Sequence, residues 1–332
     1  MGVTIKDVAK ASNVSIATVS RVINNKDEGV SNDTRERIKQ IMKEMDYRPS
    51  GIARGLVTKK THTLGLIVPD ISNPFFPAIV KGIEDSARNS GYNIILCNSD
   101  DSPHKEVTSI RVLKEKCVDG IIYIGTNSAS SEGIILLQED NTPFVYIDRS
   151  NDITECSSVS TDGRIGMYKM TEYLIQNGHK SIAYIKGSVN DERVEGCVKA
   201  LEEHELKLNS QLIYIGDFRL KSGEDGARVL LKKGIKFTAI VCENDLMAAG
   251  VMEYLTRNNI RVPEDISVTG YDDIYISQLL HPKLTTIHQQ TYEMGKKSVE
   301  VLLKSIITKE TVYERIVLEP TLIIRNSVKN II

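Results

Sequence analysis

The sequence predicts a small all-α helix-turn-helix head followed by an α/β core of two subdomains, each built on a doubly wound parallel sheet. The head is indicated by apolar residues at helical spacing and by the lack of any proline before Pro49. The core is indicated by short apolar runs that alternate with amphipathic stretches from Thr63 onwards, which is typical of repeated βα units. The alternation occurs in two successive runs, so we expect two similar subdomains with a cleft between them. A length of 332 residues is sufficient for this arrangement.

Residues 14–24 (VSIATVSRVIN) predict the recognition helix of the head. Ser15 is a suitable N-cap, because its hydroxyl can accept a hydrogen bond from an N–H group of the first turn. The apolar face of this helix is formed by Val19, Val22 and Ile23. Its outward face, near the N-terminus of the helix, carries Ile16, Ala17 and Arg21. In a helix-turn-helix this face meets base edges in the major groove of DNA.

The flanking residues predict the other two helices of the head. Thr4 is the expected N-cap of the first helix, and Asp7 stands three residues later, close to a capping box. Residues 11–13 form the expected tight turn. Ser31 opens a third helix, whose apolar face is formed by Ile38, Ile41, Met42 and Met45. An ordinary three-helix bundle with a solvated charged face is the alternative interpretation of this pattern alone.

The distribution of charge favours the DNA-binding interpretation. The net charge is −2, but the first 60 residues carry about five more basic than acidic residues, whereas the remainder has an acidic excess. A basic head suits the phosphate backbone of DNA, because counterions released from the phosphates contribute to affinity.

Three segments of the head resemble one protein family. They read TIKDVA at residues 4–9, VSxATVSRVIN at residues 14–24 and YRPSGIARGL at residues 47–56. They are closely similar to the head and hinge of lactose-repressor (LacI/GalR) family transcription factors. The resemblance implies a set of DNA-contacting residues: Thr4, Ser15, Ile16, Ala17, Thr18, Arg21, Asn24 and Leu56.

The connector behind the head is predicted to act as a hinge. Pro49 and Gly51 end the third helix. Residues 52–56 can form little more than one helical turn, and so short a helix is unstable alone in water. The resemblance implies that it forms on DNA beside its twin, with Leu56 as an apolar wedge in the minor groove. A flexible tether with one exposed leucine is the alternative.

The domain boundaries follow from these patterns. We expect a helix-turn-helix domain at residues 1–48, a hinge at 49–61 and an effector-binding core at 62–332. Within the core, the N-subdomain is expected at about 62–160 and 290–320, and the C-subdomain at about 161–289 and 321–332.

The core is predicted to alternate strands and helices. The strands of the first run are expected at residues 64–68, 92–96, 120–124 and 144–147, with helices at 75–89 and 107–116. The strands of the second run are expected at 181–185, 212–215, 238–242 and 266–269, each with a helix before or after it, starting near residue 162. A helix at 289–308 and short strands at 312–318 and 322–325 complete the chain.

Polar and aromatic residues follow the ends of these strands, where ligands of open parallel sheets bind. Carboxylates accept hydrogen bonds from hydroxyl groups, arginine donates them, and aromatic rings cover the C–H faces of a sugar. Capping of the following helix and packing in the core are the alternative roles for any one of these residues. Together they indicate a sugar site.

The core resembles periplasmic ribose-binding proteins and, within the family, ribose-operon repressors. The matching motifs are NPFF, IDR, RVEG, GDF, ND, GYD and TIxQ. The resemblance implies that the effector is contacted by Asn73, Phe75, Phe76, Asp148, Arg149, Arg193, Phe218, Asn244, Asp272 and Gln289. Purine-binding relatives carry an aromatic residue where this chain has Arg149. Asp101 stands where ribose binders have asparagine, and the loop before Arg193 is short, so a related pentose or another monosaccharide remains open.

Several classes of protein do not fit the sequence. It has no Gly-rich phosphate loop, dinucleotide fingerprint or nucleophile elbow, so we do not expect an enzyme. The five cysteines are scattered and the six histidines lack metal-ligand spacing, so no cofactor or metal is expected. No leader and no apolar run of membrane-spanning length is seen, which favours a cytoplasmic regulator over a transport-associated binding protein and predicts no membrane partner.

The sequence therefore predicts a transcriptional repressor whose operator affinity is controlled by ribose or a related monosaccharide. We expect a homodimer, because one head reads half a site and a dimer reads a palindromic operator. The alternatives are a catabolite control protein that answers to a phosphorylated carrier protein, and a purine-responsive repressor. Whether the effector releases or promotes DNA binding is left open.

Overall fold

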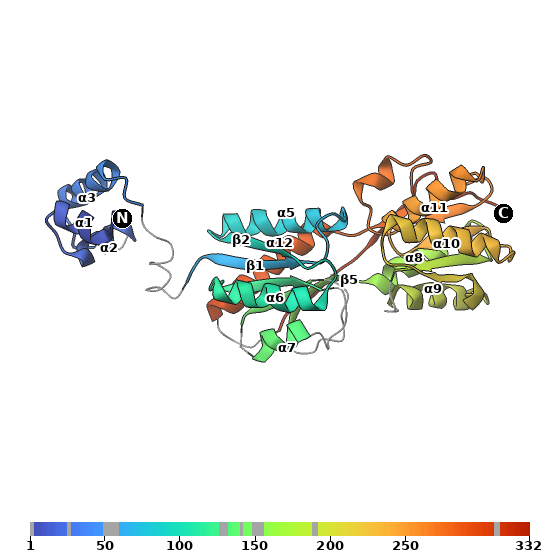
Figure 1. The fold of residues 1–332 in the computed structure, drawn as a ribbon. Helices are drawn as coiled ribbons and strands as arrows, with labels where there is room; N and C mark the ends of the chain where they lie inside the picture. The colour runs from blue at the N-terminus through green and yellow to red at the C-terminus, as the bar shows by residue number, and fades with distance from the viewer. Residues whose placement is uncertain are drawn as a thin grey trace. The chain divides into compact units, whose positions relative to one another are not determined.

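The computed structural model describes residues 3–24, 28–48, 60–125, 132–139, 142–147, 156–187, 192–308 and 313–332. The chain divides into two compact units, Met1–Thr63 and Leu64–Ile332 (Figure 1). The first unit holds the helical head, and the second holds the α/β core.

The head contains the three helices that the sequence predicts. They are α1 (Ile5–Ala11), α2 (Ile16–Ile23) and α3 (Asn32–Glu44). Thr4 and Asp7 form the expected capping box at α1, and the Ser15 and Ser31 hydroxyls each accept a hydrogen bond at the N-termini of α2 and α3. The small buried core consists of Val8, Ala9, Val19, Val22 and Ile38.

The first half of the core, which we call the N-subdomain, is built on a six-stranded sheet. Its strand order is β11-β5-β4-β3-β1-β2. The strands are β1 (Thr63–Val68), β2 (Asn93–Asn98), β3 (Gly120–Ile124), β4 (Phe144–Ile147), β5 (Ser157–Thr161) and β11 (Arg315–Leu318). β1, β3, β4, β5 and β11 run parallel to one another.

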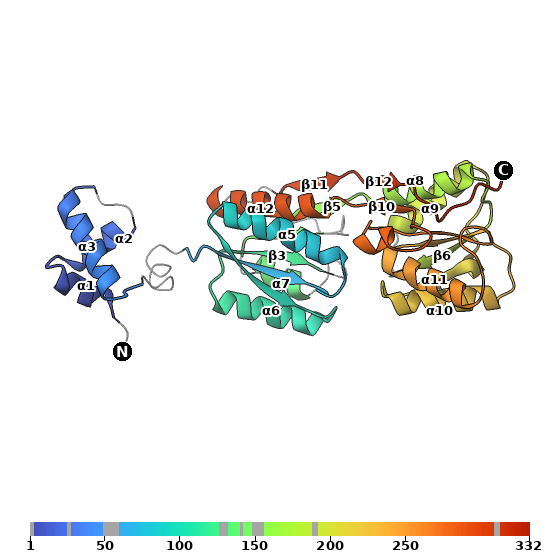
Figure 2. The same cartoon turned by 90° about the horizontal axis from the view of Figure 1, so that it is seen from above.

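Helices cover both faces of this sheet (Figures 1 and 2). The helices α5 (Phe75–Asn89) and α12 (Thr291–Thr308) pack together on one face, and α6 (Pro103–Glu115) and α7 (Glu132–Glu139) pack on the other. Leu64 and Leu66 of β1 belong to the same buried cluster as α5 and α12, whereas Ile67 belongs to the cluster of α6 and α7. Successive strand residues point to opposite faces, so burial on both sides explains the unbroken apolar run of β1.

The second half, the C-subdomain, has a four-stranded parallel sheet in the order β7-β6-β8-β9. The strands are β6 (Ile182–Lys186), β7 (Ile213–Ile215), β8 (Ala239–Cys242) and β9 (Ser267–Thr269). Two helix pairs pack around it, α8 (Gly163–Gln176) with α9 (Glu192–Glu203) and α10 (Leu220–Lys232) with α11 (Asp245–Arg257). The fold class predicted from the sequence, a helix-turn-helix head with an α/β core of two parallel-sheet subdomains, is confirmed.

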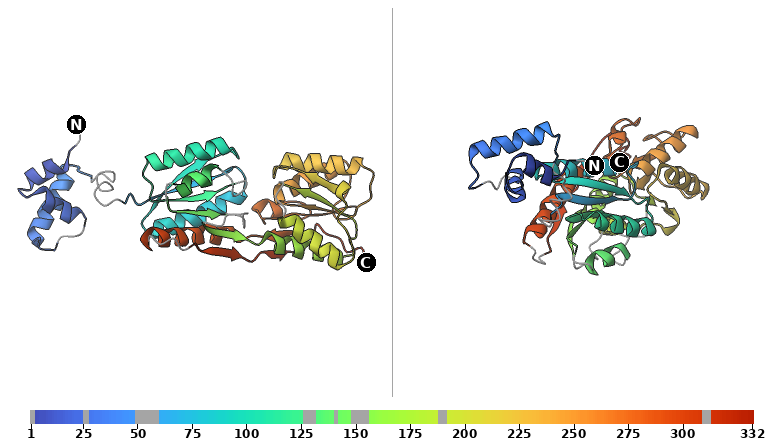
Figure 3. Two further views of the ribbon diagram at one scale, coloured as in Figure 1. Left: turned by 90° about the horizontal axis from the view of Figure 1, so that it is seen from below. Right: turned by 60° about the vertical axis from the view of Figure 1, so that its left-hand side comes forward.

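The chain passes between the two halves through neighbouring segments. β10 (Thr286–His288) and β12 (Thr321–Ile323) pair antiparallel and lie along the same side of the core as β5 and β11 (Figure 2). The last residues run along the C-subdomain (Figure 3), where the Ser327 hydroxyl donates to the Val268 carbonyl over 2.6 Å.

One α-helix, α7, and two strands, β5 and β10, were not predicted from the sequence, and neither were the short 3-10 helices Ser210–Leu212 and Tyr275–Gln278. The α7 sequence, EGIILLQE, has four consecutive apolar residues and no helical spacing. β5 has the sequence SSVST, in which Val159 is the only strongly apolar residue. Its position in the sheet comes from the parallel neighbours on both sides, β4 and β11, which a local pattern cannot reveal.

None of the helices in the described part of the chain is long and apolar enough to cross a lipid bilayer.

Candidate DNA-binding face and effector site

The outward face of α2 is exposed as the sequence predicts. The Ile16 side chain is 44% exposed, which is high for a large apolar residue. Ala17 and Arg21 are also exposed, and Arg21 makes no hydrogen bond or ion pair with any described residue. Val19 and Val22, on the opposite face, are buried. α2 therefore presents the Arg21 guanidinium and the apolar side chains of Ile16 and Ala17 to the solvent.

The remaining DNA-contacting candidates of the head have structural roles at the helix ends. The Ser15 Oγ accepts from the Thr18 N–H over 3.1 Å and lies 2.9 Å from the Thr18 Oγ1. The Thr4 N–H and hydroxyl both donate to the Asp7 carboxylate, which holds the pKa of Asp7 below its usual value. The Asn24 amide donates to the Ser20 carbonyl at the end of α2. The Ser15 and Asn24 bonds fix the two ends of the recognition helix, and the Thr4 bonds fix the start of α1.

Three candidates lie outside the described residues. Leu56, with the predicted hinge around it, is one of them, and Asp148 and Arg149 are the other two. They remain sequence predictions.

Three effector candidates come together at the strand ends of the C-subdomain: Arg193 at the start of α9, Asp272 after β9 and Gln289 after β10. The Gln289 Nε2 donates to the Asp272 Oδ1 over 2.7 Å. One Arg193 nitrogen lies 3.9 Å from the same Oδ1, and the guanidinium stacks over the Tyr271 ring at 3.8 Å. The Arg193 and Asp272 side chains are only 11% and 7% exposed, so little water screens this charged pair.

Phe218 and Asn244 form a second group beside this cluster. The Asn244 Nδ2 donates to the Phe218 carbonyl over 2.8 Å, and its Oδ1 accepts from the Met247 N–H at the start of α11. The Phe218 ring lies against Gly187, where an added Cβ would come within 2.2 Å of three ring carbons. Position 187 must therefore be glycine if the ring is to stay in this place.

The N-subdomain contributes Asn73, Phe75 and Phe76 at the start of α5. The Asn73 Oδ1 accepts from the Phe75 N–H over 3.1 Å, so this side chain supports the local turn. The two phenylalanine rings form an edge-to-face pair at 5.3 Å and are almost completely buried. They belong to the main apolar cluster of the N-subdomain, against which Leu246 and Ile276 of the C-subdomain also pack.

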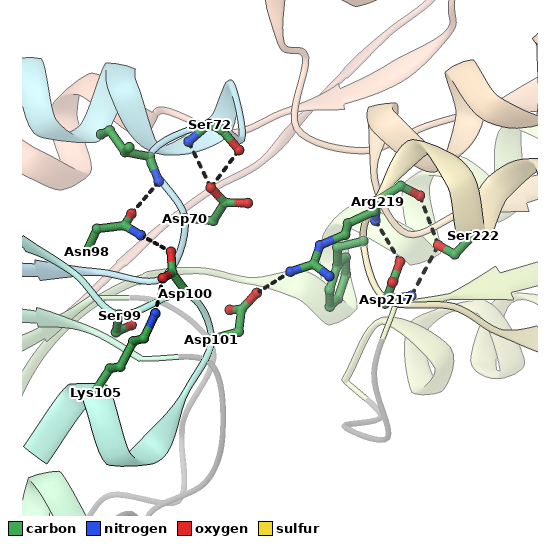
Figure 4. A network of polar contacts seen from close by, with 12 residues as sticks. Asp70, Ser72, Asn98, Ser99, Asp100, Asp101, Lys105, Asp217, Arg219 and Ser222 are labelled. Carbon is green, nitrogen blue, oxygen red and sulfur yellow. Dashed lines mark hydrogen bonds and ion pairs between the residues drawn. The ribbon is translucent and has the colours of Figure 1, made fainter.

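Polar loops of the two subdomains face each other in Figure 4. On one side, Asp70 accepts from the Ser72 N–H and hydroxyl, and the Asn98 amide and the Lys105 ammonium both donate to Asp100. On the other side, Asp217 accepts from the Arg219 N–H over 3.0 Å. The Arg219 guanidinium lies 3.7 Å from the Asp101 carboxylate, which makes an ion pair between the subdomains.

Sequence reasoning missed three residues of this region. Tyr271 lies in the GYD motif, but its stacking under Arg193 was not predicted. Arg219 follows Phe218, and no local pattern reveals that it meets Asp101 across more than a hundred residues. Glu243 was also overlooked, although it immediately precedes Asn244 at the same strand end.

Two further carboxylates, Asp245 and Asp273, lie near Asp272. Burial, with the nearby charge of Asp272, raises the pKa of Asp245 well above its usual value. Burial acts to raise the pKa of Asp273 as well, but hydrogen bonds from His288 and Arg325 outweigh it and lower that pKa. Among the described residues, no group of three or more histidine, cysteine or acidic side chains is arranged to hold a metal ion.

Two family models match the chain. The model for bacterial regulatory proteins of the lacI family matches residues 4–50, and the model for periplasmic binding proteins and the sugar binding domain of the LacI family matches residues 61–327. Together they span the head and the core.

Two curated relatives align over nearly the whole chain. The HTH-type transcriptional regulator RegA of Clostridium saccharobutylicum is 41% identical over 98% of this chain and 99% of its own length. The HTH-type transcriptional repressor PurR of Haemophilus influenzae is 37% identical over 99% of both chains.

Two solved structures extend the comparison. The lac repressor dimer bound to operator and the anti-inducer ONPF has a TM-score of 0.90 and 29% identity over 99% of this chain and all of that one. A LacI family transcriptional regulator from Enterococcus faecium with bound ribose has a TM-score of 0.73 and 30% identity over 81% of this chain and all of that one. The protein is a DNA-binding transcriptional repressor that belongs to the LacI family and has the sugar-binding domain of that family.

Proposed function

We propose that the protein is a homodimeric repressor whose operator affinity is controlled by ribose or a related monosaccharide bound between the two subdomains. The observation that carries the proposal is the buried cluster of Arg193, Asp272 and Gln289. It offers a guanidinium, a carboxylate and an amide at the carboxyl ends of parallel strands, where ligands of such sheets bind.

The chemistry of this cluster suits a polyol. The Asp272 Oδ2 can accept from a hydroxyl while Oδ1 is held by Gln289. Arg193 can donate to a second hydroxyl, and the Phe218 ring can cover an apolar face of the sugar. Asn73, Asn244, Phe75 and Phe76 complete the proposed contacts. We place Asp148 and Arg149 in the site by the resemblance alone.

The ribose-bound relative supports this choice of effector. Its chain is aligned in full with the present one at 30% identity, and it binds ribose in the solved structure. The similarity to ribose-operon repressors stated above belongs to the same proposal. RegA and PurR have a higher sequence identity to this chain than the ribose-bound regulator has, so an effector other than ribose is the main alternative.

We propose a palindromic operator and a dimer for the DNA-binding state. One α2 helix reads only half a site, and the lac repressor structure that aligns with the whole chain is a dimer on its operator. Thr4, Ser15, Ile16, Ala17, Thr18, Arg21 and Asn24 are the proposed contacts of each head, with Leu56 in the minor groove. Domain boundaries at residues 48 and 61 would separate head, hinge and core.

A thermal-shift screen of the full chain tests the effector. Pentoses, hexoses and purines are compared, and a ligand present at about 100 times its Kd should stabilise the protein by roughly 2.7 kcal/mol. We expect a shift with ribose or another monosaccharide, which the Arg149→Ala variant should lose. A shift with a purine alone, or with a phosphorylated carrier protein alone, would replace the sugar in this proposal.

A further inference from the structure

Glu243 is a buried carboxylate at the end of β8, outside the proposed effector contacts. The residue is only 2% exposed. Its Oε1 accepts from the Tyr184 hydroxyl over 3.0 Å, and its Oε2 accepts from the Gly187 N–H over 2.7 Å. The carboxylate therefore joins β8 to the loop that follows β6.

The main chain of Glu243 reaches the effector cluster as well. Its carbonyl oxygen accepts a hydrogen bond from the Arg193 guanidinium. Gly187, held by the Glu243 side chain, is the residue on which the Phe218 ring rests. The next residue, Asn244, binds the Phe218 carbonyl. Glu243 thus contacts Arg193 directly, precedes Asn244 in the chain and supports the Phe218 ring through Gly187.

We propose that Glu243 is the positioning residue of the effector site, which sets the places of Arg193 and Phe218 without touching the sugar. This inference rests on the proposed sugar-binding function and adds the part of the site that holds its contacts in place. The entropic cost of holding Gly187, Arg193 and Phe218 in place is already met in the folded protein, so less of it opposes ligand binding.

The chemistry of a carboxylate is what this position requires. The Tyr184 hydroxyl and the Gly187 N–H both donate to Glu243, and an ionised carboxylate accepts at both oxygens, whereas an amide accepts at one end and donates at the other. Burial raises the pKa of Tyr184 well above its usual value, so its hydroxyl remains a donor. In Glu243→Gln, the amide NH₂ would face either the Tyr184 hydroxyl or the Gly187 N–H, and one buried bond would be lost.

The structure contains a matched control in the other subdomain. Glu106 of α6 is 4% exposed and accepts from the buried Tyr123 hydroxyl over 2.7 Å. Glu106→Gln therefore makes the same chemical change to a buried glutamate–tyrosine pair. Glu106 is placed in no part of the proposed effector site.

The experiment compares the wild type, Glu243→Gln and Glu106→Gln as full chains. We expect Glu243→Gln to raise the monosaccharide Kd in calorimetry by about tenfold and to speed amide exchange at Gly187 in the ligand-free protein. We expect Glu106→Gln to lower Tm by about as much as Glu243→Gln does. It should leave both the sugar Kd and the Gly187 exchange within about twofold of wild type. Tyr184→Phe keeps the bond to Gly187, serves if Glu243→Gln fails to fold, and should give a smaller change of the same sign.

Two results would overturn the positioning role. One is a sugar Kd within about twofold of wild type in both Glu243→Gln and Tyr184→Phe. The other is equal loss of sugar affinity in Glu106→Gln, because general destabilisation would then explain the effect. If the wild type binds no monosaccharide, the proposed function fails, and amide exchange at Gly187 alone then tests the positioning role. Faster exchange only in the Glu243 and Tyr184 variants supports that role, and unchanged exchange contradicts it.

Discussion

The two proposed binding surfaces of this protein differ in whether their polar side chains have hydrogen-bond or ion-pair partners within the protein. On α2 of the head, Ile16 and Arg21 point to solvent, and Arg21 has no partner among the described residues. In the core, Asp272 and Gln289 are buried and hydrogen-bonded to each other, and Arg193, whose side chain is 11% exposed, forms an ion pair with Asp272. The head exposes a face that another macromolecule can cover, whereas the core holds an ordered polar cluster of the size of a small molecule.

Because of this difference, we expect mutations of the head surface to affect only DNA binding and mutations of the core cluster to affect both ligand binding and stability. An exposed, unpaired side chain contributes little to folding, so its loss affects only the partner. A buried, bonded side chain supports both the ligand and the fold, because its removal leaves other polar groups unsatisfied. The following predictions test that separation.

The largest effect is expected for Arg193→Ala. The variant loses the ion pair with Asp272, the stacking on Tyr271 and the bond to the Glu243 carbonyl, so both sugar affinity and Tm should fall. We expect the Kd in calorimetry to rise about 5- to 150-fold, equivalent to about 1–3 kcal/mol. Arg164→Ala is the control, because Arg164 pairs with Glu195 on the exposed surface of the same subdomain. An unchanged Kd in Arg193→Ala would remove the cluster from the effector site.

A comparable loss, restricted to DNA, is expected for Arg21→Ala. An arginine in the major groove can bind guanine through two hydrogen bonds, so discrimination at one base position per half-site should fall by about 1–3 kcal/mol. Operator variants in a fluorescence anisotropy titration measure this, with Tm expected to stay as in the wild type. Arg37→Ala, on the exposed surface of α3, is the control for charge alone. A uniform loss over all operator sequences would show that Arg21 contacts only phosphate.

Mild acid should distinguish the head from the core. His179 in the core is buried between the Thr238 hydroxyl and the Lys329 carbonyl, and burial lowers its pKa. The unfolded chain therefore takes up a proton first, and the free energy of unfolding of the core should fall as pH drops through about 6.5, by up to about 1.4 kcal/mol per pH unit. Residues 1–48 contain no histidine. In the head, the lowered pKa of Asp7 gives a loss of stability only in stronger acid.

Calorimetric unfolding between pH 7.5 and 5 checks this prediction. His179→Gln should be less stable than the wild type at pH 7.5 and should show a smaller decrease on acidification. An identical pH dependence in the two proteins would show that His179 does not change its protonation in this range.

The smallest effect is expected for the ion pair between Asp101 and Arg219. Both side chains are substantially exposed, at 40% and 60%, and such pairs contribute about 0.2–1 kcal/mol. In a double-mutant cycle of Asp101→Asn and Arg219→Gln, measured on the sugar Kd, we expect coupling of this size that disappears at high salt. The exposed Lys81–Asp85 pair within α5 should give no coupling to the sugar. Coupling that is independent of salt would exclude an ion pair.

Much of this architecture could be predicted from the sequence because its signals are local. Ser15 and Ser31 cap their helices in the predicted places, since a cap depends on a few neighbouring residues. β1, β3 and β4 are apolar runs buried on both faces, and each was predicted within one residue. The strand end where Asp272 lies followed from the same pattern, whereas Gln289 follows β10, which was not predicted.

What the sequence could not provide depends on contacts between distant segments. The pairing of Gln289 with Asp272 was not predicted, and neither was the bond between Glu243 and Gly187, because each partner lies at the end of a different strand. Phe75 and Phe76 remain proposed sugar contacts, and the sequence did not show that both also belong to the buried cluster of the N-subdomain. Residue type at a strand end indicates the chemistry of a site, but the fold decides which groups are already satisfied.

The central claim is that a monosaccharide in the core changes the DNA affinity of the head. It is tested most directly by titrating the full chain onto a palindromic operator, selected from a random library, with and without saturating ribose or the monosaccharide identified by the screen. The account predicts that the sugar changes the operator Kd about 5- to 150-fold, equivalent to a coupling free energy of about 1–3 kcal/mol, and that Arg193→Ala removes the response while still binding the operator. The same operator Kd with and without a sugar that binds the core would contradict it.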